Sequence, residues 1–365
     1  MRKILKVALF NEERAYTELT LPASPYTVLD ALEKLRLDEG APHHWGIVDK
    51  LQIGRLVKYL DQDGSFFELN ALCQRLAVLN EEELAVVEGL ARMEHNGDAQ
   101  PVPLPGLINM AYSTDRCHLV EEVVNDHTLG RFCAENGFVP EADNLSDKAF
   151  ELLDFAKIGQ EFRQNEGGVF TSGGYVQKHD ELRQVYGSLN LTPKQPDYSI
   201  LVETASGCQI RLPLPMGEAV ADGPMQCVDC AAPSLIGLSG TLATCNMLAH
   251  RLTELEMDRE LTKYKAVLDA VRCDELGRAL TLADELDEYT LDQKVCEPED
   301  VAVERLAAGL SSEDMELLLP RLNLYSFGKD LLEHSGGTIT GYGLIQPNGS
   351  EQEHQPAQGG MEGLQ

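Results

Sequence analysis

The chain has 365 residues, of which 43% are hydrophobic, so it is long enough for two or three domains with buried cores. Sixty acidic residues against thirty basic ones give a net charge of −30. Such a charge repels nucleic acids, anionic membranes and phosphate ligands at long range, and it attracts basic proteins. Solubility or a salt-adapted host would explain the same charge.

The acidic excess is spread along the chain. Residues 1–185 hold 31 acidic and 18 basic side chains, a net charge of −13, and residues 186–365 hold 29 and 12, a net charge of −17. The basic and apolar start, MRKILKVALF, is too short in its apolar run for a signal peptide, and no stretch approaches the length of a membrane span. We therefore expect a cytoplasmic protein whose nine cysteines are reduced.

The first elements form a strand pair and a helix. Alternating apolar residues predict strands over residues 4–10 and 18–21. A helix should follow, with Ser24 as its N-cap and Pro25 as its first residue. A second helical region spans residues 67–93, where Glu81, Glu82 and Glu83 open a new helix whose positive N-terminal dipole suits carboxylates.

The middle of the chain is predicted as a linker over residues 96–106, a helical segment over 119–124 and a short helix over 150–162. The sequence EGGVFTSGGY follows at 166–175. It resembles a phosphate-binding loop, Gly-x-x-x-x-Gly-Lys-Ser/Thr, but Gly174 takes the place of the lysine. Because strand-forming residues flank these glycines, the segment is better explained as a hairpin with glycines in its turns.

The same pattern returns near the C-terminus, which indicates an internal repeat. Residues 155–177 align with 324–346 without a gap, and residues 69–79 align with 245–255 through the pattern Asn-x-Leu-x-x-Arg-Leu. A looser match pairs residues 7–22 with 198–213. We therefore predict a first repeat at 1–185, with subdomains at about 1–64, 65–110 and 111–185. A linker at 186–196, a second repeat at 197–346 and a disordered tail at 347–365 complete the division.

Several segments resemble the antirestriction proteins of the ArdA type. In the run at 154–162, Asp154, Phe155, Gly159 and Glu161 fit the family pattern, whereas Ile158 and Gln160 depart from it. The other similar segments are LPASPYTVLDALEKL (21–35), ELNALCQRLAVLNEEEL (68–84) and YSTDRCHLVEEVV (112–124). The resemblance covers most of the first repeat and is weaker in the second, and the chain is about twice the length of a simple member.

The resemblance implies a fold and a function. It implies an elongated α+β protein, here made of two tandem ArdA-like repeats of small subdomains. Family members are acidic, usually dimeric DNA mimics of conjugative elements that occupy the DNA-binding groove of type I restriction-modification enzymes. We therefore expect no catalysis, no cofactor, no direct binding to nucleic acid or membrane, and a homodimer. The alternative is an acidic adaptor of a mobile element that binds basic partners without inhibiting restriction.

The candidate binding residues are carboxylates in three groups. A helix through 284–288 would expose four of them on its outer face. The full set is Glu81, Glu82, Glu83, Glu121, Glu122, Asp126, Asp284, Glu285, Asp287 and Glu288. A weaker chemical alternative is Cys227-Val-Asp-Cys230, because zinc sites use such pairs; no second pair exists, so Cys208, Cys245 or His250 would have to complete the site. Ordinary thiols and redox chemistry remain the other interpretations.

Overall fold

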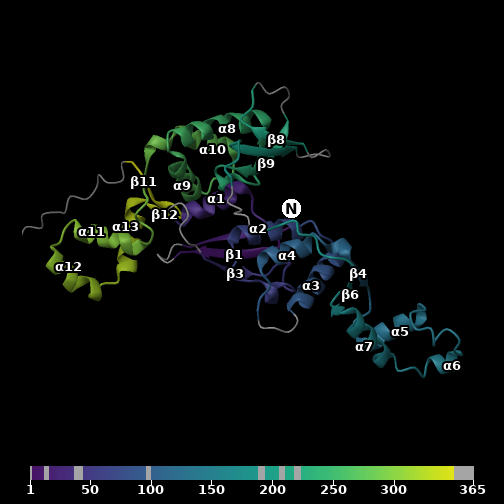
Figure 1. The fold of residues 1–365 in the computed structure, drawn as a ribbon. Helices are drawn as coiled ribbons and strands as arrows, with labels where there is room; N and C mark the ends of the chain where they lie inside the picture. The colour runs from purple at the N-terminus through teal and green to yellow at the C-terminus, as the bar shows by residue number, and fades with distance from the viewer. Residues whose placement is uncertain are drawn as a thin grey trace, which may run out of the picture. The chain divides into compact units, whose positions relative to one another are not determined.

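The structure is a computed structural model that describes residues 2–11, 16–36, 44–95, 100–187, 194–204, 210–217 and 223–348. It is a mixed α+β structure with small antiparallel sheets, which confirms the predicted α+β class at this level (Figure 1). Its internal contacts divide the chain into two units. Unit 1 comprises residues 1–23 and 37–193, and unit 2 comprises residues 24–36 and 194–365.

Unit 1 contains two three-stranded antiparallel sheets separated by helices. In the first sheet β1 lies between β2 and β3, and in the second β6 lies between β4 and β5. The strands are β1 Leu5–Phe10, β2 Tyr16–Leu21, β3 His44–Asp49, β4 Cys117–Val120, β5 Val169–Thr171 and β6 Gly174–Lys178. The helices are α2 Phe66–Leu76, α3 Glu81–His95, α4 Leu104–Ala111, α5 Asp126–Glu135, α6 Asp147–Phe150 and α7 Phe155–Glu166.

Unit 2 follows the same plan with one additional strand. Its first sheet has the order β10-β9-β7-β8 and its second the order β11-β13-β12. The strands are β7 Ile200–Thr204, β8 Arg211–Leu214, β9 Pro224–Cys230, β10 Ser239–Thr241, β11 Tyr289–Asp292, β12 Thr338–Thr340 and β13 Gly343–Pro347. The helices are α1 Pro25–Lys34, α8 Leu242–Met257, α9 Leu261–Val271, α10 Leu276–Asp284, α11 Pro298–Ala307, α12 Ser312–Leu318 and α13 Leu324–Ser335.

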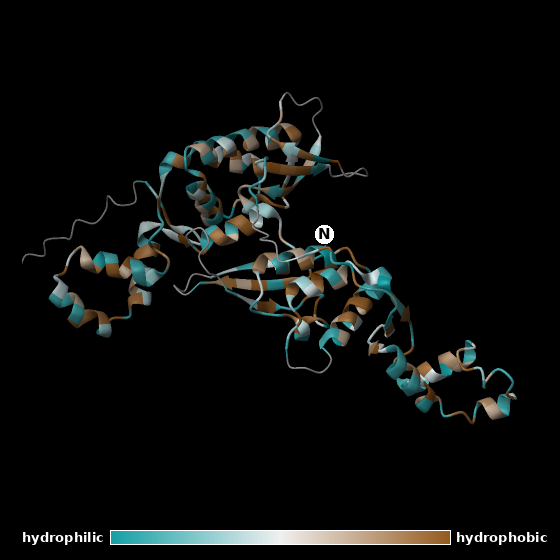
Figure 2. Ribbon diagram, viewed as in Figure 1, coloured by the Kyte–Doolittle hydropathy of each residue, from teal (hydrophilic) through white to brown (hydrophobic). Residues whose placement is uncertain are grey.

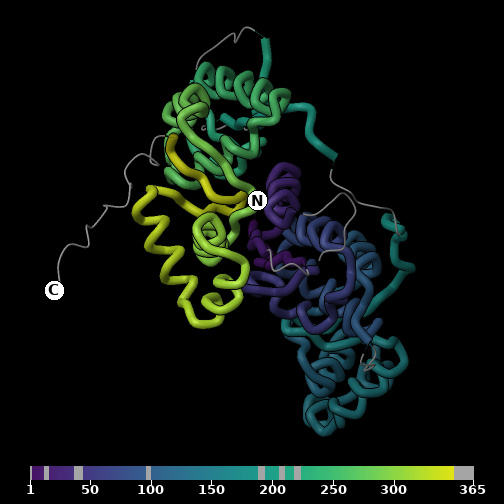
Figure 3. Tube along the Cα trace, turned by 90° about the vertical axis from the view of Figure 1, so that its left-hand side faces the viewer, coloured from purple at the N-terminus to yellow at the C-terminus, as the bar shows by residue number. Residues whose placement is uncertain are grey.

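The helix α1 follows β2 in the sequence, but its contacts lie with unit 2. Figures 1 and 3 both show α1, coloured purple, against the green strands and helices that come two hundred residues later. Its partners there include β9 and the 3-10 helix that follows it, Pro233–Leu235. Each predicted repeat is one continuous stretch of sequence. The observed units differ from the repeats because residues 24–36 of the first repeat belong to unit 2.

Corresponding side chains make the same contacts in the two units. The Asn70 amide bonds the backbone N–H and C=O of Ala23, at 2.9 and 3.2 Å, and the Asn246 amide bonds those of Met216 at 2.9 and 3.1 Å. The Arg75 guanidinium donates to the carbonyl of Ala111, the last residue of α4. Arg251 donates in the same way to the carbonyl of Ala283, near the end of α10. The Asn and Arg side chains of the repeated pattern thus stabilise backbone turns through hydrogen bonds.

Amphipathic sequence patterns explain how the units form their cores. Along β1, Leu5, Val7 and Leu9 are buried, whereas the residues between them are partly exposed, as a half-buried strand requires. Figure 2 shows the corresponding mixture of hydrophobic and hydrophilic residues along the helices. A large buried cluster in unit 2 joins β7, β9, α8, α9 and α10, and it includes Tyr26 of α1.

The structure confirms several predicted elements. Strands β1 and β2 and the helix α1 form where expected, and the Ser24 side chain accepts a hydrogen bond from the Thr27 N–H as an N-cap. The glutamates at 81–83 open α3 as predicted. Residues 188–193 of the predicted linker and 349–365 of the predicted tail lie outside the described residues.

Three other predicted segments are wrong. Residues 117–120 form the strand β4 and not the start of a helix, because they pair with β6 and place Leu119 opposite Val176. The predicted linker at 96–106 ends early, since α4 begins at Leu104. The helix predicted over 150–162 begins only at Phe155, as α7, because residues 151–154 separate it from the short helix α6 and the Asp154 side chain caps α7 by accepting from the Lys157 N–H.

The glycine segment is a hairpin, as predicted. Strands β5 and β6 pair antiparallel, with Thr171 opposite Gly174, and the Thr171 hydroxyl donates to the Gly174 carbonyl at 3.0 Å. Gly174 has φ of 139°, and a Cβ there would lie 2.3 Å from the Val120 carbonyl oxygen. Gly343 repeats this arrangement with φ of 135° against the Asp292 carbonyl. Backbone proximity and conformation therefore explain these glycines without a phosphate ligand.

Candidate acidic surface

The carboxylates that open α3 have three different environments. Glu81 forms an ion pair with Arg2 at 3.4 Å, with 69% of its side chain exposed. The Glu83 carboxylate accepts from the Asn80 N–H at 2.9 Å, while the Asn80 side chain accepts from the Glu83 N–H at 2.8 Å, which is a reciprocal helix cap. Glu82 is exposed. Only part of this predicted group is therefore available to a partner.

The second group follows β4. Glu121 and Glu122 are exposed, and Glu122 adopts a positive φ of 63°. Asp126 accepts two hydrogen bonds from the Arg163 guanidinium, at 2.7 and 3.1 Å, and so joins α5 to α7. The bidentate pair raises the pKa of Arg163, chiefly through the hydrogen bond from its side chain to Asp126. The role of Asp126 is thus structural, whereas the two glutamates face solvent.

The third group lies at the end of a helix and not along one face. Helix α10 ends at Asp284, and Asp287 and Glu288 belong to a 3-10 turn, Leu286–Glu288, that leads into β11. The predicted helical continuation is wrong because Leu286 is buried and turns the chain towards the sheet. Arg251 pairs with Asp284 at 3.4 Å and Arg278 pairs with Glu285 at 3.1 Å.

The position of this third group strengthens its negative potential. The C-terminal end of a helix carries a partial negative charge, so carboxylates there are electrostatically unfavourable and add to the field of the dipole. Among the residues that the structure describes, no ion pair involves Glu82, Glu121, Glu122, Asp287 or Glu288. These five carboxylates are the part of the predicted set that is free to attract a basic partner.

The equivalent turn of unit 1 has a different chemistry. It runs from Tyr112 to Arg116, and the extended segment 179–187 covers it. The Asn109 amide bonds the Tyr186 N–H at 2.8 Å and carbonyl at 2.9 Å, and the Ser113 hydroxyl accepts from the Arg183 N–H at 2.9 Å. Asp115 pairs with Arg183. One turn is therefore occupied by the chain itself, and the other exposes carboxylates.

The two cysteines of the zinc alternative lie inside the core of unit 2. Cys227 and Cys230 are 1% and 0% exposed, and a shift of the β7–β9 register at Val228 brings both to the buried side. A hydrogen bond with Cys230, together with burial, raises the pKa of the Cys227 thiol well above its usual range. Cys245 is also buried, whereas His250 is exposed and Cys208 lies outside the described residues. In the described part of the chain no three His, Cys, Asp or Glu side chains gather as metal ligands.

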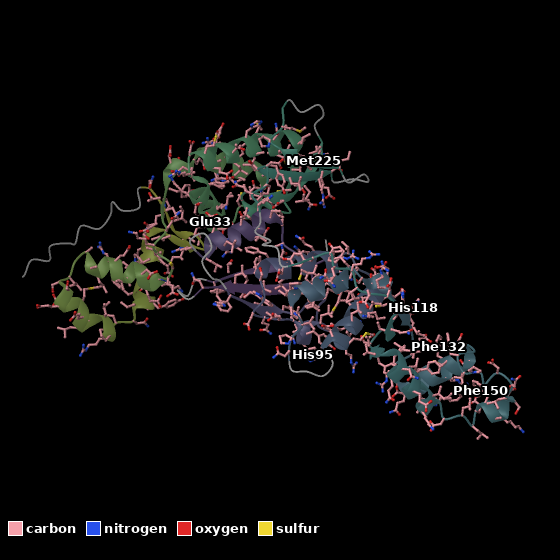
Figure 4. The ribbon with its side chains drawn as sticks, viewed as in Figure 1. Glu33, His95, His118, Phe132, Phe150 and Met225 are labelled. Atoms are coloured by element: carbon pink, nitrogen blue, oxygen red, sulfur yellow. The ribbon has the colours of Figure 1, made fainter. Side chains whose placement is uncertain are left out.

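A buried ionic cluster in unit 2 escaped sequence reasoning. Lys265 of α9 is 6% exposed and lies 3.1 Å from Asp30 and 2.7 Å from Glu33, both on α1 (Figure 4 labels Glu33). The Tyr342 hydroxyl donates to Asp30 at 2.7 Å, and this hydrogen bond is also buried. The sequence signal was weak: Asp30 interrupts the apolar face of a helix, which is visible only once that face is known to be buried.

Two adjoining clefts on unit 2 lie beside this cluster, with volumes of about 450 and 380 Å³. They share Thr262 and Gln293, and their basic residues are Arg36, Arg259, Lys263 and Lys294. Glu33 and Glu260 lie among them, and Lys263 pairs with Glu260 at 3.4 Å. Asp287 of the third acidic group also lines the first cleft, together with Arg259 and Lys263, so the clefts are of mixed charge and adjoin the acidic surface.

Comparison with protein-family models and with curated proteins finds no match to this chain. Within the described ranges, none of the helices has both the length and the apolar character needed to cross a membrane. The geometry of the carboxylates and the charge of the chain consequently carry the functional argument.

Proposed function

We propose that the protein is a non-enzymatic DNA mimic that occupies the DNA-binding groove of a type I restriction-modification enzyme. The observation that carries this proposal is the net charge of −30, distributed over both halves of the chain. The exposed carboxylates Asp287 and Glu288, just beyond α10, and Glu121 and Glu122, just after β4, support it, because no ion pair among the described residues involves them and they add negative potential to these surfaces.

The amount of charge is adequate for mimicry. Duplex DNA carries one negative charge for about every 1.7 Å of its axis, so thirty excess charges correspond to roughly 15 base pairs, or about 50 Å of duplex. Binding to a basic groove should then be fast at low salt and weaken as salt screens the charges.

The internal correspondence supports the resemblance to ArdA-type proteins. The two units share their element order and the backbone contacts of Asn70 and Asn246, which suits a chain of two tandem ArdA-like repeats. The homodimer belongs to the same proposal. In unit 2, Leu317, Leu318, Leu322 and Tyr325 are exposed within nine residues of sequence, and a second copy of the chain would cover such an apolar patch.

A competition experiment tests the proposal. A type I restriction enzyme is given labelled DNA and increasing amounts of the protein, and both DNA binding and cleavage are measured at low and moderate salt. We expect stoichiometric protein to displace the DNA and to stop cleavage, with a weaker effect at moderate salt. Persistent cleavage at stoichiometric excess, with the DNA still bound, would exclude mimicry for that enzyme. A complex that forms while DNA remains bound would favour the adaptor function instead.

A matched pair of variants separates a specific surface from net charge. The first replaces Asp284, Glu285, Asp287 and Glu288 with their amides. The second makes the same change at four exposed carboxylates of α11 and α12, namely Glu304, Glu313, Asp314 and Glu316. We expect the first variant to lose at least about tenfold more inhibition than the second, since each lost ion pair across an interface weakens binding. Equal losses would show that only total charge matters.

A further inference from the structure

In the sequence, helix α1 lies between two segments of unit 1, but its contacts are with unit 2. The chain leaves unit 1 after Ala23, forms α1 within unit 2, and returns to unit 1 at Leu37. The strands on either side of this excursion, β2 and β3, both pair with β1. The segment that connects two strands of the unit 1 sheet is thus itself part of the unit 2 fold.

The N-terminal end of α1 is held by a buried carboxylate. Asp229 of β9 is 2% exposed, accepts hydrogen bonds from the Tyr198 hydroxyl at 2.9 Å and from the Cys230 N–H at 3.0 Å, and lies close enough to Ser24 and Tyr26 at the start of α1 for both to lower its pKa. A carboxylate at a helix N-terminus is favoured by the helix dipole. Burial nevertheless raises the pKa of Asp229, and these polar neighbours oppose that effect. The Tyr26 hydroxyl donates to the Tyr198 carbonyl beside it.

The last turns of α1 are held by the ionic cluster of α9. Lys265 lies between Asp30 and Glu33, and the Thr262 hydroxyl donates to Glu33 at 2.5 Å. Lys34 reaches Asp269 at 3.7 Å and lies 4.7 Å from the centre of the Tyr342 ring. Together, Tyr198, Asp229, Thr262, Lys265, Asp269 and Tyr342 form what we call the α1 docking site.

Unit 2 has no room in its own sequence for an equivalent helix. Between Ala23 and His44 the first repeat has twenty residues, whereas between Met216 and Pro224 the second has seven. Unit 1, in turn, lacks the docking site. Asp49 is the counterpart of Asp229, because both lie next to a register shift between two strands, but Asp49 is exposed. The counterparts of Lys265 and Tyr342 are Ala85 and Gly173, which have no polar side chain. Within the described residues, one such helix and one docking site are therefore found for the two units.

From this arrangement we propose that α1 couples the stability of the two units, so that release of α1 from unit 2 loosens β3 of unit 1. Strands β1 and β2 are neighbours in the sequence, so their pairing does not pass through α1. Among the described strands, β3 pairs with β1 alone, at the edge of the sheet, and it follows the segment that contains α1. Release of α1 converts that segment into a long flexible connection, and the entropy of closing it then opposes the pairing of β3.

Hydrogen exchange and fluorescence of the full-length protein test the coupling. Asp229→Ala disturbs the α1 docking site, and Asp49→Ala is its matched control in unit 1. We expect Asp229→Ala to lower amide protection about tenfold in α1 and at least about threefold in β3, with a smaller change in β2. The single Trp45 lies on β3, so its fluorescence should report a lower urea midpoint in the same variant. Asp49→Ala should change the protection of α1 by less than about twofold.

A second variant keeps the test decisive. Lys265→Met replaces the buried cation and leaves Asp30 and Glu33 without it, which should release α1 more strongly than Asp229→Ala does. Loss of protection in α1 with β3 and the Trp45 transition unchanged would overturn the coupling. Retention of α1 protection in both variants would overturn the docking site itself.

Discussion

Unit 1 and unit 2 share a plan of strands and helices, but they differ in what their side chains hold. The shared positions bond backbone: Asn70 and Asn246 fix the residue that follows a strand and a proline, and Arg75 and Arg251 fix the end of a helix. The side chains that differ between the units bind different segments. In unit 2 they bind α1, and in unit 1 they bind the segment 179–187. The two units therefore share a plan of elements and differ in the segments that their surfaces bind.

The turns after α4 and α10 show this divergence most clearly. In unit 1 the turn binds the chain's own segment through Asn109 and Ser113, and its only carboxylate, Asp115, pairs with Arg183. In unit 2 the same turn has four carboxylates, at residues 284, 285, 287 and 288. At this turn unit 1 has structural hydrogen bonds and unit 2 has exposed carboxylates, so of the two turns that of unit 2 suits the proposed binding function better.

The largest expected effect tests whether the shared plan depends on close helix crossings. A Cβ at Gly159 would lie 1.8 Å from the Asp126 carbonyl oxygen, and one at Gly328 would lie 1.7 Å from that of Pro298. Because backbone must move in both cases, Gly159→Ala and Gly328→Ala should each lower stability by about 3 kcal/mol. Hydrogen exchange in α7 and α13 measures this. Gly277→Ala is the control, since open space surrounds that position; tolerance of alanine at 159 or 328 would contradict the crossing geometry.

A smaller effect tests the equivalence of the two asparagines. Asn70→Ala and Asn246→Ala each remove two hydrogen bonds to backbone, so we expect losses of about 2 kcal/mol in each unit. Urea unfolding followed by Trp45 fluorescence reports unit 1, and hydrogen exchange in α8 reports unit 2. If only one of the two variants lost stability, the units would share their arrangement of elements but not the contacts that stabilise it.

Sequence reasoning recovered the parts of this plan that rest on local chemistry. The cap of α1 at Ser24, the carboxylates that open α3 and the glycine hairpin at 171–174 follow from short-range rules, and the structure confirms them. Strand β4 was mistaken for helix because its sequence has no alternation and only its pairing with β6 decides its conformation. The docking of α1 was out of reach because residues more than two hundred positions apart, such as Asp30 and Lys265, define it.

The same limit applies to the acidic surface. Composition identified its charge, but the cations that neutralise Asp126 and Glu285 lie 37 and seven residues away and were assigned only by the fold. The sequence therefore overestimates how many of the ten carboxylates are free.

The smallest expected effect concerns pH and the docking site that unit 1 lacks. Burial, together with the charge of Asp30, raises the pKa of Tyr342 far above its ordinary value of 10.0. Burial alone would lower the pKa of Lys265, but Asp30 and Glu33 outweigh it and raise that pKa as well. Both groups hold their protons more tightly in the folded state than in the unfolded state. Their contribution is therefore complete below pH 10 and is lost as the pH rises above it.

Tyr342→Phe should lower the stability by about 1 kcal/mol at pH 7, because Asp30 loses one donor. Between pH 10 and 11 the variant should also lose stability less steeply than the wild type, by up to about 1.4 kcal/mol per pH unit, since one proton-linked group has been removed. Urea midpoints from hydrogen exchange in α1 and α9 over pH 8–11 measure both effects. A parallel decline in variant and wild type would show that Tyr342 ionises as freely as a surface tyrosine, and the docking site would then be far less buried than its contacts require.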